Sequence, residues 1–497
     1  MKVTGLVLAA IIATAASAPL AGAQTTQSAN NPTWWDKYLY LTKNGSDLAP
    51  GTTTSASVGD NVDVSAECGP QSETYITLSP SRPRILAAGS NEIFRDPMRG
   101  YFSADGGATW GGVDLPLPPP RQGTNDQRFG SDPSLAFDTR GDLYYSYIVV
   151  FFGNGSGVNG TEMAVARSTD GGRSYPSVTY FSFETGSSRF NDKPMITADT
   201  NTKSPFRDRV YVAWDAAVGG SGGGGVRVGR SADHGASFSV NRADDPKGPG
   251  KAIGAVPFVG PGGEVYVAWN DYKANTIGVN RSCDGAATWG TAGVVAAKRI
   301  PFDIGIPAES FRGALVYPAC DADRSSGPHR GRLYCSWLDL NADGMTTGIM
   351  LSFSDDRGTS WSPAAPVGDR VARVDRFNHW LSVDPVTGQA TVAFYDTRHD
   401  TTGNRYQTDY YLARSSDGVS WLPDTRVSDV SSNEHDCDGT FPCAAINYGN
   451  QQGDYEGLVS FGGVSYPIWT DSRRQLEPAA GCRRPLLMEE VFTAAVP

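Results

Sequence analysis

Beyond its first 23 residues the chain has no long hydrophobic run and no excess of basic charge. No later stretch approaches the roughly 20 consecutive apolar residues that a membrane-spanning helix requires, so we predict no membrane partner. The chain has 42 Lys and Arg against 53 Asp and Glu, a net charge of -11. Because phosphate backbones are bound by clustered basic residues, this balance also argues against a nucleic-acid partner.

Extended helical periodicity and low-complexity tracts are also absent after the N-terminus. Glycine and proline are plentiful instead, with 58 and 32 residues. They separate short segments rich in β-branched and aromatic residues, which is typical of strands joined by tight turns. We therefore predict an all-β globular chain.

The N-terminus is the one apolar segment of note. Lys2 is followed by LVLAAIIATAA and by small residues ending in AGA before Gln24, the pattern of a secretory signal peptide. We predict a signal peptide over residues 1–23, a tail and lead-in over 24–60, and a single domain over 61–497. The protein is then expected to be secreted, either extracellular or periplasmic, and monomeric.

Seven cysteines in an exported chain favour disulfides and leave one thiol over. Sequence does not fix the pairing. The hypotheses are Cys320 with Cys335 across a hairpin, Cys437 with Cys443 in one loop, and Cys68 with Cys482 near the chain ends. Cys283 would remain as the odd thiol.

One octapeptide recurs six times along the chain. The copies are SADGGATW, STDGGRSY, SADHGASF, SCDGAATW, SDDRGTSW and the shortened SSDGVSW, beginning at Ser103, Ser168, Ser231, Ser282, Ser354 and Ser415. Ser and Asp side chains can bond their own backbone, glycines supply positive φ, and the closing aromatic packs under a sheet. The pattern therefore predicts a stapled turn.

A strand-like segment precedes each octapeptide, and a seventh precedes the C-terminus: RILAAGS, LYYSYIV, VYVAWD, VYVAWN, LYCSWLD, TVAFYD and SYPIWTD. Each unit contains four short strands. Repeated four-stranded units are stable when packed radially, so we predict a seven-bladed β-propeller, with a six-bladed ring as the alternative. An N-terminal strand such as VDVSA at 62 would close the ring beside the last blade.

The octapeptide resembles the Asp box, or bacterial neuraminidase repeat, of sialidases and related propellers. This resemblance implies a glycoside hydrolase that acts on an anionic glycan with a Tyr nucleophile, a Glu partner, an Asp acid/base and a clamp of three arginines. By position it implies Tyr455 as nucleophile, with Glu456 or Asp454 beside it, and Asp96 as acid/base. Ile76 stands where the family carries its first clamp arginine, and Glu309 is a second candidate for the Glu partner.

Inner-strand starts and second-strand ends meet on one face of a propeller, away from the octapeptide turns, so candidate substrate-binding residues are sought there. These candidates are Arg312, Arg376, Arg398, His379, Asp132 and Asp192. No cofactor is required by this chemistry. The loop residues Glu434, His435, Asp436 and Asp438 are candidate ligands for calcium, since hard cations prefer oxygen donors.

Two other functions fit the same face. A polysaccharide lyase would use His379 and Tyr455 to remove and donate protons at a uronic acid. A non-catalytic propeller would bind a glycan or a protein there.

Overall fold

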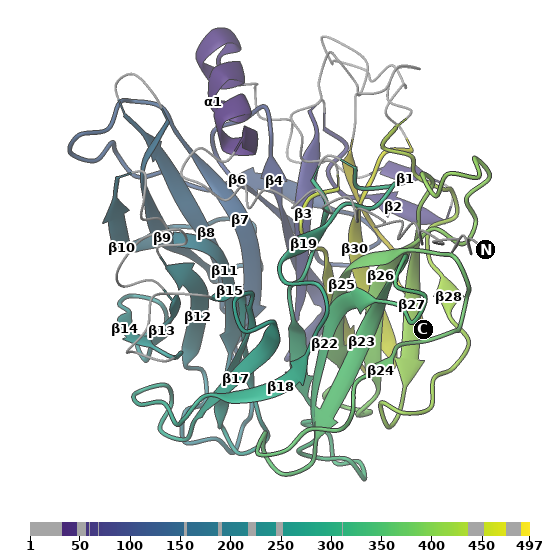
Figure 1. Cartoon of the computed structure of the whole chain (residues 1–497). Coiled ribbons are helices and arrows are strands. Elements are labelled where there is room, and N and C mark those ends of the chain that lie inside the picture. Colours follow the sequence, from purple (N-terminus) through teal and green to yellow (C-terminus); the bar gives the residue numbers. More distant parts are fainter. Residues whose placement is uncertain are drawn as a thin grey trace, which may run out of the picture.

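The computed structural model contains seven antiparallel sheets arranged around a central axis (Figure 1). It describes residues 32–46, 56–58, 60–67, 69–153, 157–186, 191–216, 225–244, 252–310, 312–435, 452–473 and 489–497. The predicted signal peptide, Asp436, Asp438 and the cysteines of two hypothetical pairs lie outside these residues. Among the residues described, no helix has the length and apolarity needed to cross a membrane.

The first four blades follow the chain without a crossover. Blade 1 contains β3 (Gln71–Ser79), β4 (Arg82–Glu92), β5 (Arg99–Ser103) and β6 (Gly111–Asp114). Blade 2 contains β7 (Arg128–Phe137), β8 (Leu143–Phe152), β9 (Val158–Ser168) and β10 (Ser177–Thr185). Blade 3 contains β11 (Asn191–Ala198), β12 (Val210–Ala216), β13 (Gly225–Ser231) and β14 (Ser239–Arg242). Blade 4 contains β15 (Ala252–Val259), β16 (Val265–Asp271), β17 (Thr276–Ser282) and β18 (Gly293–Ala297).

The remaining blades follow a small hairpin formed by β19 (Asp303–Ile304) and β20 (Ala314–Leu315). Blade 5 contains β21 (Ala319–Ala322), β22 (Leu333–Leu340), β23 (Thr347–Ser354) and β24 (Ala365–Pro366). Blade 6 contains β25 (Arg376–Val383), β26 (Ala390–Asp396), β27 (Asp409–Ser415) and β28 (Thr425–Arg426). The predicted seven-bladed propeller is confirmed, and the six-bladed alternative is not.

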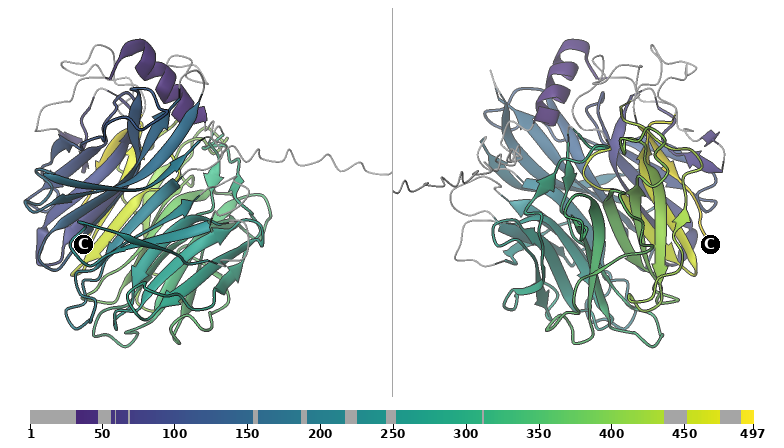
Figure 2. Two further views of the ribbon diagram at one scale, coloured as in Figure 1. Left: turned by 90° about the vertical axis from the view of Figure 1, so that its left-hand side faces the viewer. Right: turned by 45° about the vertical axis from the view of Figure 1, so that its right-hand side comes forward.

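Blade 7 joins the two ends of the described chain. It contains β29 (Gly457–Phe461), β30 (Val464–Asp471), β31 (Glu490–Thr493), β2 (Asn61–Asp63) and β1 (Ala56–Val58). The strand pairing Val62↔Thr493 places an early strand beside the last one, as predicted. The two views in Figure 2 show these C-terminal strands next to the N-terminal strands of blade 1. The ring is thus closed by main-chain hydrogen bonds.

The six octapeptides form the turns between third and fourth strands. In the first copy the Ser103 hydroxyl donates to Asp105 at 2.8 Å, and Asp105 accepts the Thr109 hydroxyl at 2.6 Å. The first serine of every copy pairs with a residue at or near the start of the second strand in its blade. These turns therefore lie on the rim where inner strands end, here called the lower rim. The upper rim is where inner strands start and second strands end.

A helix not predicted from the sequence lies on the upper rim. α1 (Pro32–Asn44) falls within the segment expected to be a tail, and Figure 1 shows it above blades 1 and 2. Tyr38 stacks on Phe152 with ring centroids 4.3 Å apart, and Tyr40 stacks on Phe94 at 4.0 Å. Packing against the ends of β8 and β4 thus stabilises a short helix that would be marginal alone.

One predicted disulfide is present. Cys320 and Cys335 are bonded across the β21–β22 pair, as expected from their hairpin spacing. Cys283 is free and exposed. The predicted pairs Cys68–Cys482 and Cys437–Cys443 lie outside the described residues.

Candidate functional site

Five inner strands are interrupted at the same place near the upper rim. The pairing register of β3, β7, β11, β15 and β25 shifts there, and one residue in each has positive φ: Glu73 (54°), Asp132 (61°), Lys193 (47°), Gly254 (68°) and Asn378 (41°). A bulge of this kind re-aims a side chain and is common beside functional sites. Buried polar groups converge here, and we call them the central ring: Glu73, Asp132, Asp192, Lys193, Asp215, Arg312, Tyr317, Asp454 and Tyr455.

Lys193 is the unusual member of the central ring. Its side chain is 2% exposed, and its ammonium has no hydrogen-bond partner among the described residues. It lies 3.3 Å from the centroid of the Tyr455 ring and 4.2 Å from that of Tyr317. Burial lowers the pKa of Lys193 to about 8, while the nearby Asp454 and Glu73 carboxylates oppose this effect. A buried cation whose hydrogen bonds are unused in the described part of the chain is able to bind an anionic group.

The other cation, Arg312, holds a carboxylate in place. Its guanidinium makes a bidentate contact with Asp454, in which Nη2 donates to Oδ2 at 2.7 Å. The Tyr317 hydroxyl donates to the same oxygen at 3.2 Å. The Tyr317 ring fills the space beside Gly254, where an added Cβ would approach within 2.3 Å of it. Asp454 is thus an oriented carboxylate, which is 7% exposed.

A carboxyl pair from blades 2 and 3 faces this carboxylate. The Asp132 carboxylate accepts the Ser131 hydroxyl at 2.7 Å and the Lys193 backbone N–H at 3.0 Å. Burial, then the adjacent Asp132 and Asp215, raise the pKa of Asp192 well above its usual range, and a hydrogen bond to Asp132 adds to this. A neighbouring carboxylate disfavours ionisation of a buried carboxyl group. Asp192 is therefore the member of the central ring suited to supply a proton.

Asp215 gives a prediction for the pH dependence of stability. Burial raises its pKa to about 8, although Oδ2 accepts the Gly254 N–H at 2.6 Å. The folded chain retains this proton between about pH 4 and pH 8 while the unfolded chain loses it, so the group lowers stability as pH rises through that window. Asp215→Asn is expected to lose less stability than wild type between pH 5 and pH 8 in urea unfolding. Equal losses in the two proteins would contradict the buried, protonated state.

The sequence predicts a glutamate beside the Tyr455 hydroxyl, but the structure places a backbone carbonyl there. The hydroxyl donates to the Pro133 carbonyl at 3.2 Å, and burial followed by the nearby Asp132 raises the pKa of Tyr455 well above its usual value. The neighbouring Glu456 does not contact this hydroxyl, because it points between blades 1, 6 and 7 and accepts the Tyr395 hydroxyl at 2.7 Å. Glu309 instead accepts the Gln452 N–H at 3.3 Å. Tyr455 therefore lies in the central ring, and among the described residues no glutamate forms a hydrogen bond with its hydroxyl.

Two of the three candidate clamp arginines lie apart from the third. Arg376 donates to Asp396 at 2.8 Å, to Asp424 at 3.0 Å and to two backbone carbonyls between blades 5 and 6. Arg398 donates to the same two carboxylates, at 2.7 Å each. The structure thus joins Arg376 with Arg398 in a structural ion-pair cluster, and it places only Arg312 in the central ring.

His379 and Asp96 lie at the edges of this region. His379 is buried, its Nε2 has no partner in the described part of the chain, and burial lowers its pKa to about 4, so it is neutral. Asp96 lies beneath the segment after α1, where its backbone N–H donates to Ser46 at 3.0 Å and Oδ1 accepts from Gln127 at 2.6 Å. Lys37 of α1 lies close by, and it donates to the Glu92 carbonyl.

Calcium binding stays a prediction. Of its four candidate residues, Glu434 and His435 are described, and the His435 Nε2 donates to the Pro307 carbonyl at 2.7 Å. Elsewhere in the described residues, Asp138, Asp142 and His234 are close enough to share an ion. The Arg140 guanidinium, however, lies among them and pairs with both carboxylates at 3.0 Å. The two carboxylates of that cluster are therefore already neutralised by Arg140.

No family model matches the sequence, and no curated protein matches it. The structure is similar to a leech intramolecular trans-sialidase, with 14% identity, a TM-score of 0.46 and coverage of 73% of this chain and 68% of that one. It is similar to the intramolecular trans-sialidase of Ruminococcus gnavus, with 13% identity and a TM-score of 0.40 over 86% and 95% of the two chains. It is also similar to an α-L-arabinanase of Penicillium chrysogenum, with 16% identity and a TM-score of 0.37 over 59% and 91%. At these values the likeness concerns the fold, and function is argued from the side chains of the central ring.

Proposed function

We propose that the protein is a secreted glycoside hydrolase that acts on an anionic glycan at the central ring. The observation that carries this proposal is the position of Lys193, a buried ammonium with no hydrogen-bond partner among the described residues, close to the oriented Asp454 carboxylate and to Asp192, whose pKa burial raises well above its usual range. Glycoside hydrolysis uses one protonated and one ionised carboxyl group. The Cys320–Cys335 disulfide supports export, because such bonds persist in oxidising compartments.

Each group has a role in this mechanism. Asp192, whose pKa is raised by burial and by the adjacent carboxylates, donates its proton to the glycosidic oxygen as the bond to the anomeric carbon breaks. Asp454, oriented by Arg312 and Tyr317, accepts a proton from the water that attacks that carbon. Lys193 binds the carboxylate or sulfate of the substrate. A small part of the central ring is exposed, on Arg312, Asp454 and Asp192. A substrate would first contact the site at these side chains.

A substrate panel with a matched pair of lysine variants tests the proposal. Sialosides, uronic-acid polymers, sulfated glycans and neutral glycans are incubated with the protein, and products are followed by reducing sugar and by the absorbance of an unsaturated product. Reducing sugar released from an anionic glycan supports a hydrolase. The unsaturated product would instead show a lyase, and no product from any glycan would show that the propeller is non-catalytic.

Lys193→Met is expected to lower kcat/KM for the anionic substrate by about 100-fold, because a desolvated charge contact is lost. Lys298→Met is the control. Burial also lowers the pKa of Lys298 to about 8, but its ammonium is fully used by Asn275, Ile300 and Pro301. The control should lose stability and keep its activity. If the two variants lost activity equally, Lys193 would have no specific role in binding the anion.

A further inference from the structure

The inner strands also enclose a cavity at the end of the propeller opposite the central ring. Two residues beyond the bulges, Tyr75 of β3 and Trp380 of β25 meet edge to face, with ring centroids 5.3 Å apart. Their rings lie between the central ring and the ends of the inner strands. Below them is a cavity of about 170 Å³, lined by residues from the inner strands of all seven blades. It opens at the lower rim, on the side of the octapeptide turns.

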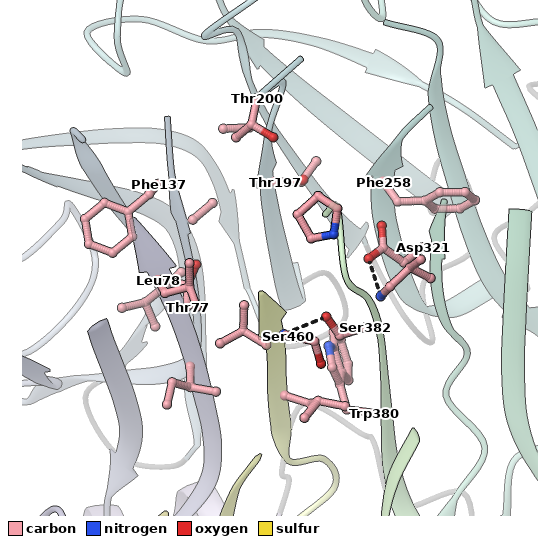
Figure 3. Close-up of a pocket in the computed structure, with 18 of the residues that line it drawn as sticks. Thr77, Leu78, Phe137, Thr197, Thr200, Phe258, Asp321, Trp380, Ser382 and Ser460 are labelled. Atoms are coloured by element: carbon pink, nitrogen blue, oxygen red, sulfur yellow. Dashed lines mark hydrogen bonds between the residues drawn. The ribbon is translucent and has the colours of Figure 1, made fainter. Parts of the chain in front are cut away.

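Hydroxyl groups line this cavity at matching positions of the inner strands. Thr77 and Thr197 lie four residues beyond the bulge residues Glu73 and Lys193, and Thr200 lies beside them (Figure 3). The side chains of these three threonines have no hydrogen-bond partner among the described residues, and all three are half-buried. Ser382 accepts the Ser460 backbone N–H at 3.0 Å, and its own proton has no acceptor in the described part of the chain. The cavity thus offers several free donors and acceptors.

The charged groups of the cavity neutralise each other. Arg324 donates to Asp321 at 2.7 Å, and Asp321 also accepts the Val383 backbone N–H at 2.9 Å. No other charged side chain lines the cavity among the residues described. Among the described residues, the cavity therefore has no unpaired cation that would bind an anionic ligand. It also has no set of carboxylates that would bind a metal ion.

Aromatic rings supply the apolar surface. Trp380 lies at the inner end of the cavity, and Phe137 and Phe258 lie on its sides (Figure 3). An apolar ring face combined with free hydroxyls suits a ligand that has C–H faces and hydroxyl edges. The volume is close to that of an engineered cavity of about 150 Å³ that binds benzene, so the cavity has room for a ligand of about one ring.

We propose that this lower-rim cavity binds one neutral sugar ring. It is separate from the central ring and requires no charge. A hydroxyl-rich ring would replace the hydrogen bonds of the displaced water, with Thr77 and Thr197 as its partners on opposite sides of blade 2. This site would hold a neutral glycan while chemistry takes place on the opposite rim, and its existence does not depend on the activity proposed above.

Binding of methyl glycosides tests the proposal. Methyl glucopyranoside, methyl galactopyranoside, methyl mannopyranoside and glucuronic acid are titrated into the full-length protein, with binding read by saturation-transfer NMR and calorimetry. At least one neutral glycoside should bind, and Thr77→Val/Thr197→Val should weaken it at least tenfold. Lys193→Met should leave that binding unchanged, which separates this site from the central ring.

Thr276→Val is the matched control. Thr276 is also half-buried in a strand, and its side chain has no hydrogen bond to any residue that the structure describes, but it lies in blade 4 outside the cavity. This variant should bind the glycoside as wild type does. The proposal is overturned if no neutral glycoside binds, if the double variant binds like the control, or if glucuronic acid alone binds. Circular dichroism of the double variant shows whether a loss of binding reflects unfolding, and Thr77→Ser/Thr197→Ser, which keeps both hydroxyls, should then retain binding.

Discussion

Asp192→Asn is expected to lower kcat by roughly 100- to 10,000-fold, the range that a positioned acid contributes. The amide keeps the size of the carboxyl group, but its N–H protons are not acidic enough to be transferred to the leaving oxygen. In wild type, kcat should fall as pH rises through the raised pKa of Asp192. The variant should lose this dependence on Asp192, because the titrating group is gone.

Asp199→Asn is the control for this change. Asp199 is buried at the far end of the same inner strand, where Oδ1 accepts the Asn201 N–H at 3.0 Å, and burial also raises its pKa. It should affect thermal stability and leave kcat unchanged. A wild-type kcat in Asp192→Asn would mean that another group donates the proton, and the proposed mechanism would be wrong.

Gly457→Ala is expected to destabilise the fold by about 3 kcal/mol. An added Cβ at Gly457 would lie 2.8 Å from the backbone nitrogen of Ile76 and 2.8 Å from the Cα of Tyr75. Both atoms belong to the backbone of β3, so relief requires the inner strands of blades 7 and 1 to separate. The free energy of unfolding in urea measures the cost.

Gly462→Ala provides the comparison. Gly462 has a φ of +63°, and no atom lies within 4 Å of an added Cβ. The substitution is therefore expected to lower the free energy of unfolding by about 1 kcal/mol, through the strained backbone conformation alone. If Gly457→Ala were the milder of the two, close contact between blades 7 and 1 would not be what requires glycine there.

The fold was predictable because its signals are local and repeated. Each octapeptide forms its turn from hydrogen bonds within eight residues, such as those of Ser103, Asp105 and Thr109. Each of the six copies therefore marks one blade in the sequence without depending on the others. α1 was missed because it is only 13 residues long, and the surface that stabilises it by packing on Trp34 and Leu41 belongs to the propeller.

The site was predicted less well because it depends on backbone conformation. Arg376 and Lys193 both belong to the first residues of an inner strand. Lys193 is itself the residue with positive φ, whereas Arg376 lies two residues before its own, Asn378, and points between the blades. The bulge residues Glu73, Asp132, Lys193, Gly254 and Asn378 have no residue type in common, so no motif marked them. Lys193 was detectable only as a basic residue flanked by Asp and Pro at an inner-strand start.

The sharing of blade 7 between both ends of the chain sets an order for assembly. Val62 of β2 pairs with Ser57 of β1 on one side, but its partner on the other side, Thr493, is synthesised more than 400 residues later, so the last blade stays incomplete until then. Contacts of such large sequence separation form slowly. Ring closure is therefore expected to be a late step in folding, completed only after β31 has been synthesised.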